Sequence, residues 1–441
     1  MKYRYRTDDE MKDSGVAWIG KIPKDWEIKR NRHIFDFRRR EVNECEDTTV
    51  LSLTTSGVKV KEDLSFGKST ESYIGHQLVY PGDIVFTPRD FDQTPILSGV
   101  SKYYGCISNL YFVLKCKSNI SNYFVDYFWW GLKYKVDFFK NFSYGIRYGY
   151  NYDQFKDLLF LNPSYIEQEK IANFLDEKTS QFDLIISKKE ELIKKLEEAK
   201  KSLISEVVIG KVKVVKTVDG YELVKRSSDE MKDSGVEWLG EIPKDWEVKK
   251  FSNVIKISNG QVNPKISPYS EMILIAPNHI KSGMGKIINL ETAKEQGAES
   301  GKYICDKGDI IYSKIRPNLC KVCIAPIECL CSADMYPMKT DYKILNQEYL
   351  LWILLSDNFT RYVVLESDRV AMPKVNRESI AKFKIPTPSI EEQISLNKIL
   401  KQNDRVIDNL INKTKLQIEK LKEAKQSLIS EAVTGKIEIL D

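Results

Sequence analysis

The stretch LEEAKKSLISEVVIGKV, residues 196–212, decides the fold, because the chain repeats it at residues 421–437 as LKEAKQSLISEAVTGKI. Two more landmarks recur in the same order. MKDSGVAWIGKIPKDWE at 11–27 returns as MKDSGVEWLGEIPKDWE at 231–247, and YPGDIVFTPRD at 80–90 corresponds to DKGDIIYSKIR at 306–316. The three repeats keep their order at similar shifts of 220, 226 and 225 residues, which indicates a duplicated architecture. The 441 residues are therefore two halves built on one plan.

Each repeated ending closes a long predicted helix, from about residue 166 to 208 and from about 390 to 433. Apolar residues recur along both helices at heptad spacing, which needs a partner helix over ~40 residues. The other copy is the nearest partner, and we expect antiparallel pairing. Both helices are expected to begin with a Ser-x-x-Glu capping box and to stop at a glycine, at Ser164, Glu167 and Gly210 and at Ser389, Glu392 and Gly435.

Between these helices lie two aromatic-rich and β-branched blocks with Gly and Pro turns, roughly 25–160 and 245–385. Short strand patterns alternate with helical ones, so the predicted class is α/β or α+β with a pseudo-two-fold internal repeat. The expected order is a first globular domain at 1–162, a spacer helix at 163–211, a linker at 212–230, a second globular domain at 231–387 and a second spacer helix at 388–441.

Composition and the N-terminal residues indicate the cellular compartment in which we expect the protein. No apolar run reaches the ~20 residues of a membrane span, and the first residues lack the apolar core of a signal peptide. We therefore expect a cytoplasmic protein with reduced thiols. The cluster CKVCIAPIECLC at 320–331 could bind zinc, but its five-residue spacer favours cysteines on two strands around a turn.

The sequence holds no motif of catalysis. It lacks a dinucleotide or phosphate loop, a zinc-protease helix and a nucleophile elbow, so we expect no cofactor and a binding protein. The net charge of +5 is only mildly basic, so any DNA-binding surface must come from local clusters.

Such clusters occur in both blocks, and two of them follow the same Gly-Asp-Ile strand. Arginine can read guanine, and asparagine or glutamine can read adenine, through paired hydrogen bonds. The candidates in the first block are Arg38, Arg39, Arg40, Arg89, Gln93, Arg147, Tyr148 and Asn151. Those in the second block are Asn259, Lys265, Lys314, Arg316, Asn318, Arg369 and Lys374.

The plan and the motifs together resemble the specificity subunit of type I restriction–modification systems. The resemblance rests on the DSGVAWIGKIPKDWE repeat, the PGDIVF and KGDIIYSKIRP strands, the Glu-Gln helix openings and the LISEVVIGKV endings. It implies two target-recognition domains, each reading one half of an asymmetric, interrupted site in double-stranded DNA. It also implies partners that the residues alone do not indicate: two modification (methyltransferase) subunits and, in the full complex, nuclease/translocase subunits.

Two further hypotheses concern the repeats. The near-identical 11–27 and 231–247 stretches precede diverged domains, so we expect them to seat each domain on the helices or to meet a methyltransferase subunit. Their tryptophans would be packing anchors, and Asp13-Ser14 and Asp233-Ser234 would form turns. The alternative function is a non-catalytic adaptor whose domains bind proteins, although an adaptor does not need matched Arg/Asn/Lys loops.

Overall fold

A computed structural model describes residues 2–36, 41–63, 72–91, 93–143, 145, 148–218, 220–367 and 373–440. The chain divides into two compact units. Unit 1 contains residues 1–190 and 415–441, and unit 2 contains residues 191–414. The division falls within the two long helices, α4 (Tyr165–Val208) and α9 (Ile390–Val433), so each unit holds a globular head and one end of both helices.

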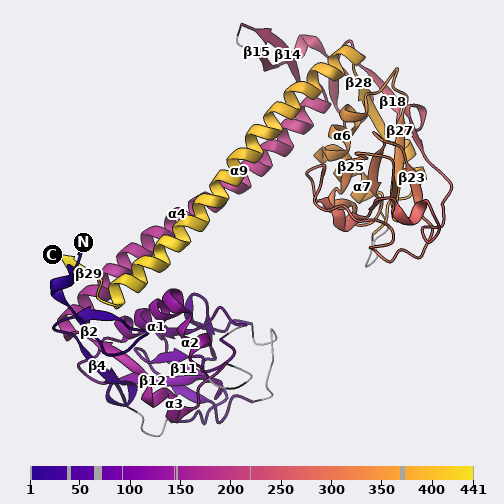
Figure 1. Ribbon diagram of the computed structural model, residues 1–441. Helices are drawn as coiled ribbons and strands as arrows, with labels where there is room; N and C mark the ends of the chain where they lie inside the picture. Colours follow the sequence, from indigo (N-terminus) through magenta and orange to yellow (C-terminus); the bar gives the residue numbers. More distant parts are fainter. Residues whose placement is uncertain are drawn as a thin grey trace. The chain divides into compact units, whose positions relative to one another are not determined.

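The two long helices pack side by side in each unit, as magenta and yellow ribbons in Figure 1. Ion pairs and hydrogen bonds establish their direction. In unit 1, Lys425 of α9 binds both carboxylate oxygens of Asp183 at 2.7 Å. In unit 2, Lys200 of α4 lies 2.5 Å from Asp404 and 2.8 Å from Asp408. Numbers rise along α4 as they fall along α9, so the predicted antiparallel pairing is confirmed.

The predicted stops of both helices are also confirmed. Gly210 and Gly435 have left-handed φ angles of 79° and 70°. The backbone N–H of Lys211 donates to the carbonyl of Glu206 at 2.9 Å, and Lys436 donates to Glu431 at the same distance. These are Schellman endings, which glycine permits because it has no side chain.

The head of unit 1 is an α+β fold around a four-stranded antiparallel sheet of order β10-β9-β12-β5. Its strands and helices are β1 (Lys2–Tyr5), β2 (Met11–Asp13), β3 (Lys21–Pro23), β4 (Glu27–Arg30), β5 (Phe35–Asp36), β6 (Leu51–Thr54), β7 (Gly57–Val60), β8 (Gln77–Val79), β9 (Ile84–Phe86), β10 (Ser98–Val100), β11 (Gly105–Ile107), β12 (Phe112–Cys116), α1 (Asn122–Val136), α2 (Phe138–Asn141), α3 (Tyr152–Asp157), β13 (Leu159–Asn162) and β29 (Ile437–Leu440).

The head of unit 2 repeats that sheet order as β25-β24-β27-β19 and adds a three-stranded sheet, β20-β26-β23. Its elements are β14 (Val212–Thr217), β15 (Gly220–Lys225), β16 (Met231–Asp233), β17 (Glu241–Pro243), β18 (Glu247–Lys250), α5 (Phe251–Val254), β19 (Ile255–Ile257), β20 (Leu274–Ile275), β21 (Ile280–Lys281), β22 (Lys286–Ile287), β23 (Tyr303–Cys305), β24 (Ile310–Ser313), β25 (Val322–Ile324), β26 (Cys329–Cys331), β27 (Met335–Thr340), α6 (Gln347–Leu355), α7 (Asp357–Leu365), α8 (Arg377–Lys382) and β28 (Lys384–Thr387).

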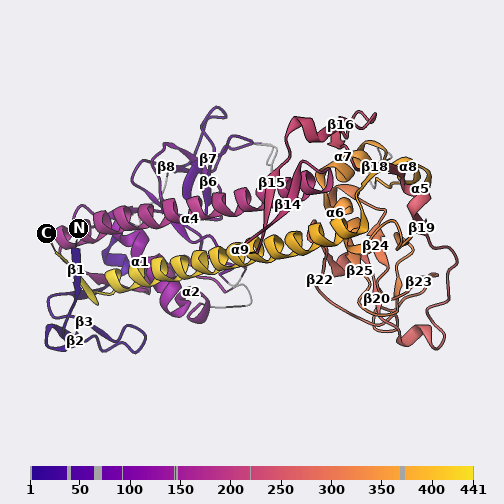
Figure 2. The same ribbon diagram turned by 90° about the horizontal axis from the view of Figure 1, so that it is seen from above.

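The segment 212–230, expected as a plain linker, contains the antiparallel hairpin β14–β15. Unit 1 builds the same ribbon from the two chain ends, because β29 pairs with β1. The termini consequently lie together (Figure 2). The backbone N–H of Arg226 donates to Lys211 at 2.9 Å, and Arg6 donates to Lys436 at 2.9 Å. The two ribbons are equivalent. β14 and β15 follow one another in the sequence, whereas β1 and β29 come from distant parts of it.

The repeated stretches pack on the ends of the long helices. A side chain at Gly435 would lie 2.4 Å from the Pro23 ring and 3.2 Å from Trp26. Trp26 itself is fully buried. In unit 2, a side chain at Gly210 would lie 2.4 Å from Pro243 and 3.1 Å from the buried Trp246. Each of these two positions therefore requires glycine for two reasons: the left-handed φ angle and the close approach of the proline and tryptophan rings.

The capping boxes are only half formed. The N–H of Glu167 donates to Ser164 Oγ at 3.3 Å, and that of Glu392 donates to Ser389 Oγ at 3.2 Å. In a complete box, the glutamate carboxylate would also accept the backbone N–H of the serine. Among the described residues, each carboxylate accepts other donors instead. Glu167 accepts the indole N–H of Trp26 at 2.9 Å and the guanidinium of Arg6 at 2.8 Å.

The glutamine next to each of these glutamates joins the helix to its head. Gln168 is buried, accepts the N–H of Ser121 at 2.9 Å and donates to the carbonyl of Pro163 at 2.9 Å. Ser121 is the N-cap of α1. Gln393 repeats these bonds with Asn346, the N-cap of α6, at 2.7 Å and with Pro388 at 2.9 Å. The Glu-Gln pair is therefore a structural joint.

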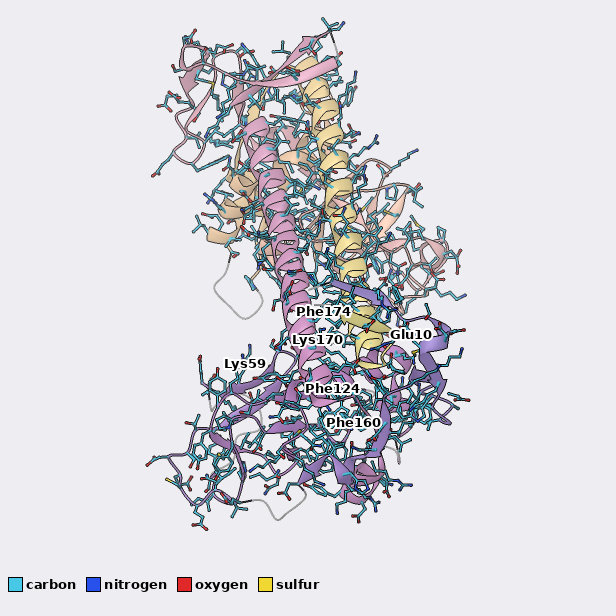
Figure 3. The ribbon with its side chains drawn as sticks, turned by 90° about the vertical axis from the view of Figure 1, so that its left-hand side faces the viewer. Glu10, Lys59, Phe124, Phe160, Lys170 and Phe174 are labelled. Carbon is cyan, nitrogen blue, oxygen red and sulfur yellow. The ribbon has the colours of Figure 1, made fainter. Side chains whose placement is uncertain are left out.

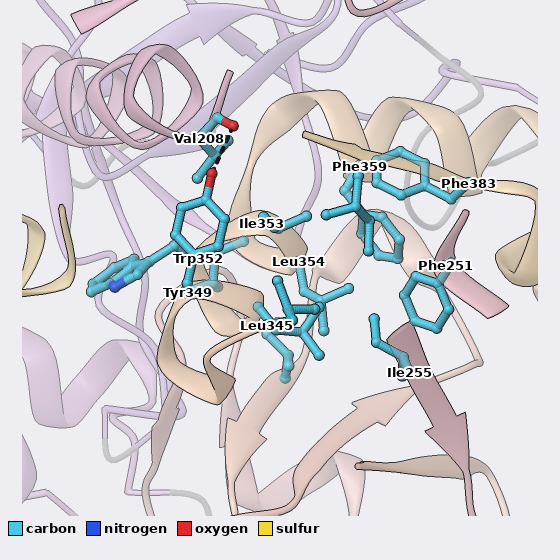
Figure 4. Close-up of a cluster of buried hydrophobic side chains, with 14 of the residues drawn as sticks. Val208, Phe251, Ile255, Leu345, Tyr349, Trp352, Ile353, Leu354, Phe359 and Phe383 are labelled. Atoms are coloured by element: carbon cyan, nitrogen blue, oxygen red, sulfur yellow. Dashed lines mark hydrogen bonds between the residues drawn. The ribbon is translucent and has the colours of Figure 1, made fainter. Parts of the chain in front are cut away.

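Aromatic residues fill the core where head and helices meet. In unit 1, Phe124 of α1 and Phe160 of β13 pack edge to face beneath the start of α4, on which Phe174 lies (Figure 3). In unit 2, Tyr349 of α6 donates its hydroxyl to the carbonyl of Val208 at 3.2 Å (Figure 4). Among the described residues, we find no helix with the length and apolar character that spanning a membrane requires.

Candidate nucleic-acid interface

The candidate interface is built on β9 in unit 1 and β24 in unit 2, which carry the repeated Gly-Asp-Ile motif. The aspartates are structural. Asp83 accepts the N–H of Tyr80 at 3.0 Å, and Asp309 accepts that of Asp306 at 2.9 Å. Both are buried. Burial raises the pKa of Asp309. Each aspartate closes the turn that feeds its strand into the core.

The chain leaves both strands through a strained turn. Asp90 follows β9 with φ 60°, and Arg316 follows β24 with φ 48°. The two residues occupy the same position of the repeat. Left-handed backbone is uncommon for residues other than glycine, and surrounding contacts must hold it. Both heads have therefore kept this strained backbone turn although their sequences have diverged.

A second segment holds each turn by the same backbone hydrogen bond. In unit 1, the N–H of Tyr150 donates to the carbonyl of Pro88 at 2.8 Å. In unit 2, the N–H of Val375 donates to the carbonyl of Lys314 at 2.9 Å. Gly149 allows this approach, because a side chain there would lie 2.8 Å from the Pro88 carbonyl. Two sequence-distant loops thus form one surface in each head.

In unit 2 this surface is cationic. Lys314 and Arg377 lie 5.7 Å and 5.3 Å from the centre of the Tyr336 ring. Lys314 and Lys374 share one carboxylate oxygen of Asp334, at 4.0 Å and 3.9 Å. Two lysines on one carboxylate, with Arg377 on the neighbouring Tyr336 ring, leave a positive surface, which suits phosphate. The phenol of Tyr336 donates to the carbonyl of Val375 at 3.1 Å, so the ring itself is held.

Two more candidates complete the surface. Asn259 accepts a hydrogen bond from Arg377, which also donates to the carbonyl of Ser258 at 3.0 Å. Arg316 is exposed, and its backbone N–H donates to Pro373 at 2.9 Å. Its guanidinium has no hydrogen bond or ion pair with any residue that the structure describes. Arg316 is therefore the side chain of this surface best placed to meet a ligand.

In unit 1 the corresponding surface carries different groups. Arg89 is half-buried, and Gln93 is exposed just beyond it. Tyr148 is 39% exposed with φ 42°. Asn151 has a structural task, because its side chain accepts the N–H of Gln154 at 2.8 Å as the N-cap of α3. The equivalent Asn376 caps α8 in the same way.

The remaining candidates lie elsewhere. Lys265 is exposed and lies 3.3 Å from Glu299. Asn318 lines a cavity toward the helices with Lys200 and Cys320, away from the Lys314 cluster. Five candidates fall outside the described residues, namely Arg38, Arg39, Arg40, Arg147 and Arg369.

Sequence reasoning missed Asp334 and Tyr336, which organise the cations of unit 2. They lie before and on β27, a strand with no base-reading pattern. The pairing of β27 with β24 brings them beside Lys314. No local signal could have found them, because only strand pairing makes them neighbours.

The cysteine cluster belongs to the core. Cys323 lies on β25, and Cys329 and Cys331 lie on β26, as expected of strand residues. With Cys305 they are buried in one apolar cluster. Burial raises the pKa of the Cys323 thiol well above its usual range. Within the described ranges, no group of three His, Cys, Asp or Glu side chains is arranged to hold a metal ion.

The known proteins that this chain resembles are specificity subunits of type I restriction enzymes. Residues 243–420 match a family model described as the type I restriction modification DNA specificity domain. The chain is 32% identical over 199 residues to the specificity subunit of the type I restriction enzyme EcoDI of Escherichia coli, covering 45% of this chain and 44% of that one. It is 24% identical over 439 residues to the MjaVIII specificity subunit of Methanocaldococcus jannaschii, covering 95% and 94%.

Solved structures share the fold. A chain from a structural study of complex assembly in a type I R-M system has a TM-score of 0.66 at 14% identity, covering 94% of this chain and 99% of that one. The HsdS subunit of Thermoanaerobacter tengcongensis has a TM-score of 0.51 at 14% identity, covering 94% and 98%.

Proposed function

Since this chain belongs to the DNA specificity (HsdS) subunits of type I restriction–modification systems, we propose that its two heads read the two halves of an asymmetric, interrupted DNA site. It is the non-catalytic component of the type I enzyme. In the proposed division, 1–162 and 231–387 are the target-recognition domains. The segments 163–211 and 388–441 are the spacer helices, and 212–230 connects the halves.

One observation carries the proposal. The two heads keep the same backbone arrangement after the same strand, with left-handed Asp90 and Arg316, while the side chains differ. A conserved frame with exchanged polar groups is what reading two different half-sites requires, because phosphate contacts set register and base contacts set sequence. An adaptor for proteins would not need the cationic surface around Tyr336.

In this proposal, Lys314, Lys374 and Arg377 hold phosphates, and Arg316 is the leading candidate for a base edge. The head of unit 1 uses Arg89, Gln93 and Tyr148 in the equivalent place. The helices set the unread gap, and each half meets one methyltransferase subunit, through which nuclease/translocase subunits join. Because the proposed ligand is genomic DNA, the proposed compartment is the cytoplasm.

The direct test is methylation mapping of the host genome with and without this gene, which reveals the modified sequence. Replacing Arg316 with glutamate is expected to weaken DNA binding about tenfold or more while assembly with the methyltransferase is retained. Lys307→Glu is the matched control, because Lys307 is exposed at the opposite end of β24. Equal methylation of the same sites by wild type and R316E would contradict the role of this loop.

A further inference from the structure

A polar and aromatic cavity of about 300 Å³ lies between the head and the helices of unit 1. The α1 residues Asp126, Tyr127, Trp130 and Tyr134 form one wall. Asp176 of α4 and residues of α9 form the other. This cavity lies apart from the loops assigned to DNA, and we call it the Asp126 cavity.

Its two carboxylates are held by neutral groups. Asp126 accepts the hydroxyl of Ser98 at 2.5 Å, and Asp176 accepts that of Tyr127 at 2.7 Å. Neither carboxylate has an ion-pair partner within the part of the chain that the structure describes. Lys425 also lines the cavity, but both oxygens of Asp183 bind its ammonium group at 2.7 Å. Asp126 is half-buried, whereas Asp176 is exposed. A half-buried carboxylate without a cation is costly, so the cavity favours positive charge beside Asp126.

Aromatic rings strengthen that preference. Trp130 and Tyr134 pack with ring centres 5.7 Å apart, and Tyr123 lines the same cavity. Ring faces attract cations, and alkylammonium groups bind well where such faces and carboxylates meet. Lys133 already lies 5.3 Å from the centre of the Trp130 ring, where its ammonium donates to the carbonyl of Thr94 at 3.2 Å.

Unit 2 contains an internal counterpart. Lys425, Ile429 and Trp130 of the Asp126 cavity correspond in the repeat to Lys200, Ile204 and Leu355, which line a cavity of about 250 Å³.

Next to this second cavity, the head supplies its own ammonium group. Lys286, on β22 of the head, contacts Asp408 and lies 3.9 Å from Asp404, both on α9. Asp404 and Asp408 correspond in the repeat to Thr179 and Asp183 of α4, close to Asp176. No cation of the described part of head 1 pairs with Asp126 or Asp176. Unit 2 therefore joins its head to α9 through an ammonium group of the head, whereas the carboxylates of the Asp126 cavity have only neutral hydrogen-bond donors among the described residues.

We propose that the Asp126 cavity binds an alkylammonium group, supplied either by a free polyamine or by a lysine side chain of a protein partner. The ammonium group would lie between Asp126 and Asp176, against the Trp130 and Tyr134 rings. It would join the head to the helices in unit 1 as Lys286 does in unit 2.

Isothermal titration calorimetry of the full chain at neutral pH and low salt tests this binding. The probes are cadaverine, which has two ammonium ends, and Nα-acetyl-lysine amide, which has one. We expect saturable binding at one equivalent. Tighter binding of cadaverine identifies a free polyamine as the source, and equal affinity identifies a lysine side chain.

Asp126→Asn is expected to weaken binding by about tenfold or more, since ~1.4 kcal/mol corresponds to a factor of ten. Tyr134→Leu, which removes a ring, should weaken it as well and provides a second variant if Asp126→Asn fails to fold. Asp153→Asn is the matched control, because that carboxylate is 92% exposed and is not among the residues that line the cavity. Absence of saturable binding, or equal affinities for wild type and both cavity variants, would overturn the proposal.

Discussion

Trp26 donates its indole N–H to the carboxylate of Glu167 across 141 positions of sequence at 2.9 Å, and this bond links the repeated stretch to the first turn of α4. Arg6 completes the site with an ion pair at 2.8 Å. Trp246 and Glu392 form the same bond in unit 2, at 2.9 Å, with Arg226 as the cation. This joint explains why the two stretches are nearly identical while the heads differ.

The first prediction concerns this joint. Trp26→Phe keeps most of the ring but leaves Glu167 without its indole donor. We expect a loss of about 1–2 kcal/mol in the free energy of unfolding, because a partly buried carboxylate loses a hydrogen bond. Urea denaturation measures this loss in the free energy of unfolding. Trp18→Phe is the control, since Trp18 packs on Phe138 without a hydrogen bond to any described residue. Equal losses in the two variants would show that the bond contributes nothing.

The second prediction compares two equivalent lysines of the helix pair. The Lys200 side chain is 9% exposed and serves two carboxylates, whereas Lys425 pairs with Asp183, whose side chain is 62% exposed. Breaking a buried pair leaves uncompensated charge and costs about 3 kcal/mol, but an exposed pair is worth ~1 kcal/mol or less. Lys200→Met should therefore destabilise far more than Lys425→Met. Similar denaturation midpoints for the two variants would contradict this difference in burial.

The third prediction is a pH dependence. Burial raises the pKa of Asp126 from 3.8 to about 6, the Ser98 hydroxyl opposes this shift and the Asp176 charge adds to it. A raised carboxyl pKa means that the folded state binds the proton more tightly than the unfolded state. Stability should therefore rise as pH falls from about 6 toward about 4, by roughly 2 kcal/mol relative to Asp126→Asn. Parallel stability curves for the two proteins across that window would refute it.

The fourth prediction concerns the spacer role of the helices. Deleting one heptad from α4 and the matching heptad from α9 shortens the helix pair by ~10 Å. At ~3.4 Å per base pair, the unread gap of the DNA site should shrink by about three base pairs. Methylation mapping of a host that carries the shortened subunit measures the gap. A retained gap in an assembled, active complex would show that the helices do not set it.

Local patterns predicted much of the fold. Heptad spacing, glycine stops and Gly-Asp-Ile strands depend on residues close in sequence, and the structure confirms them. The apolar stretch 346–364 forms two helices, because Ser356 caps a second helix and separates α6 from α7. At the candidate interface, the sequence found Lys314, Arg316 and Lys374 but could not show that they share a surface.

The sequence by itself determined the duplication, the two long helices and the separation of repeated from diverged segments, because these follow from periodicity and internal comparison. Only the tertiary structure decided where the Glu167 carboxylate goes. Its local capping bond competes with Trp26 and Arg6, and chain packing brings those stronger donors within reach. The same reason holds for the cations around Tyr336 and for the carboxylates of the Asp126 cavity. Their chemistry arises from residues that only folding makes neighbours.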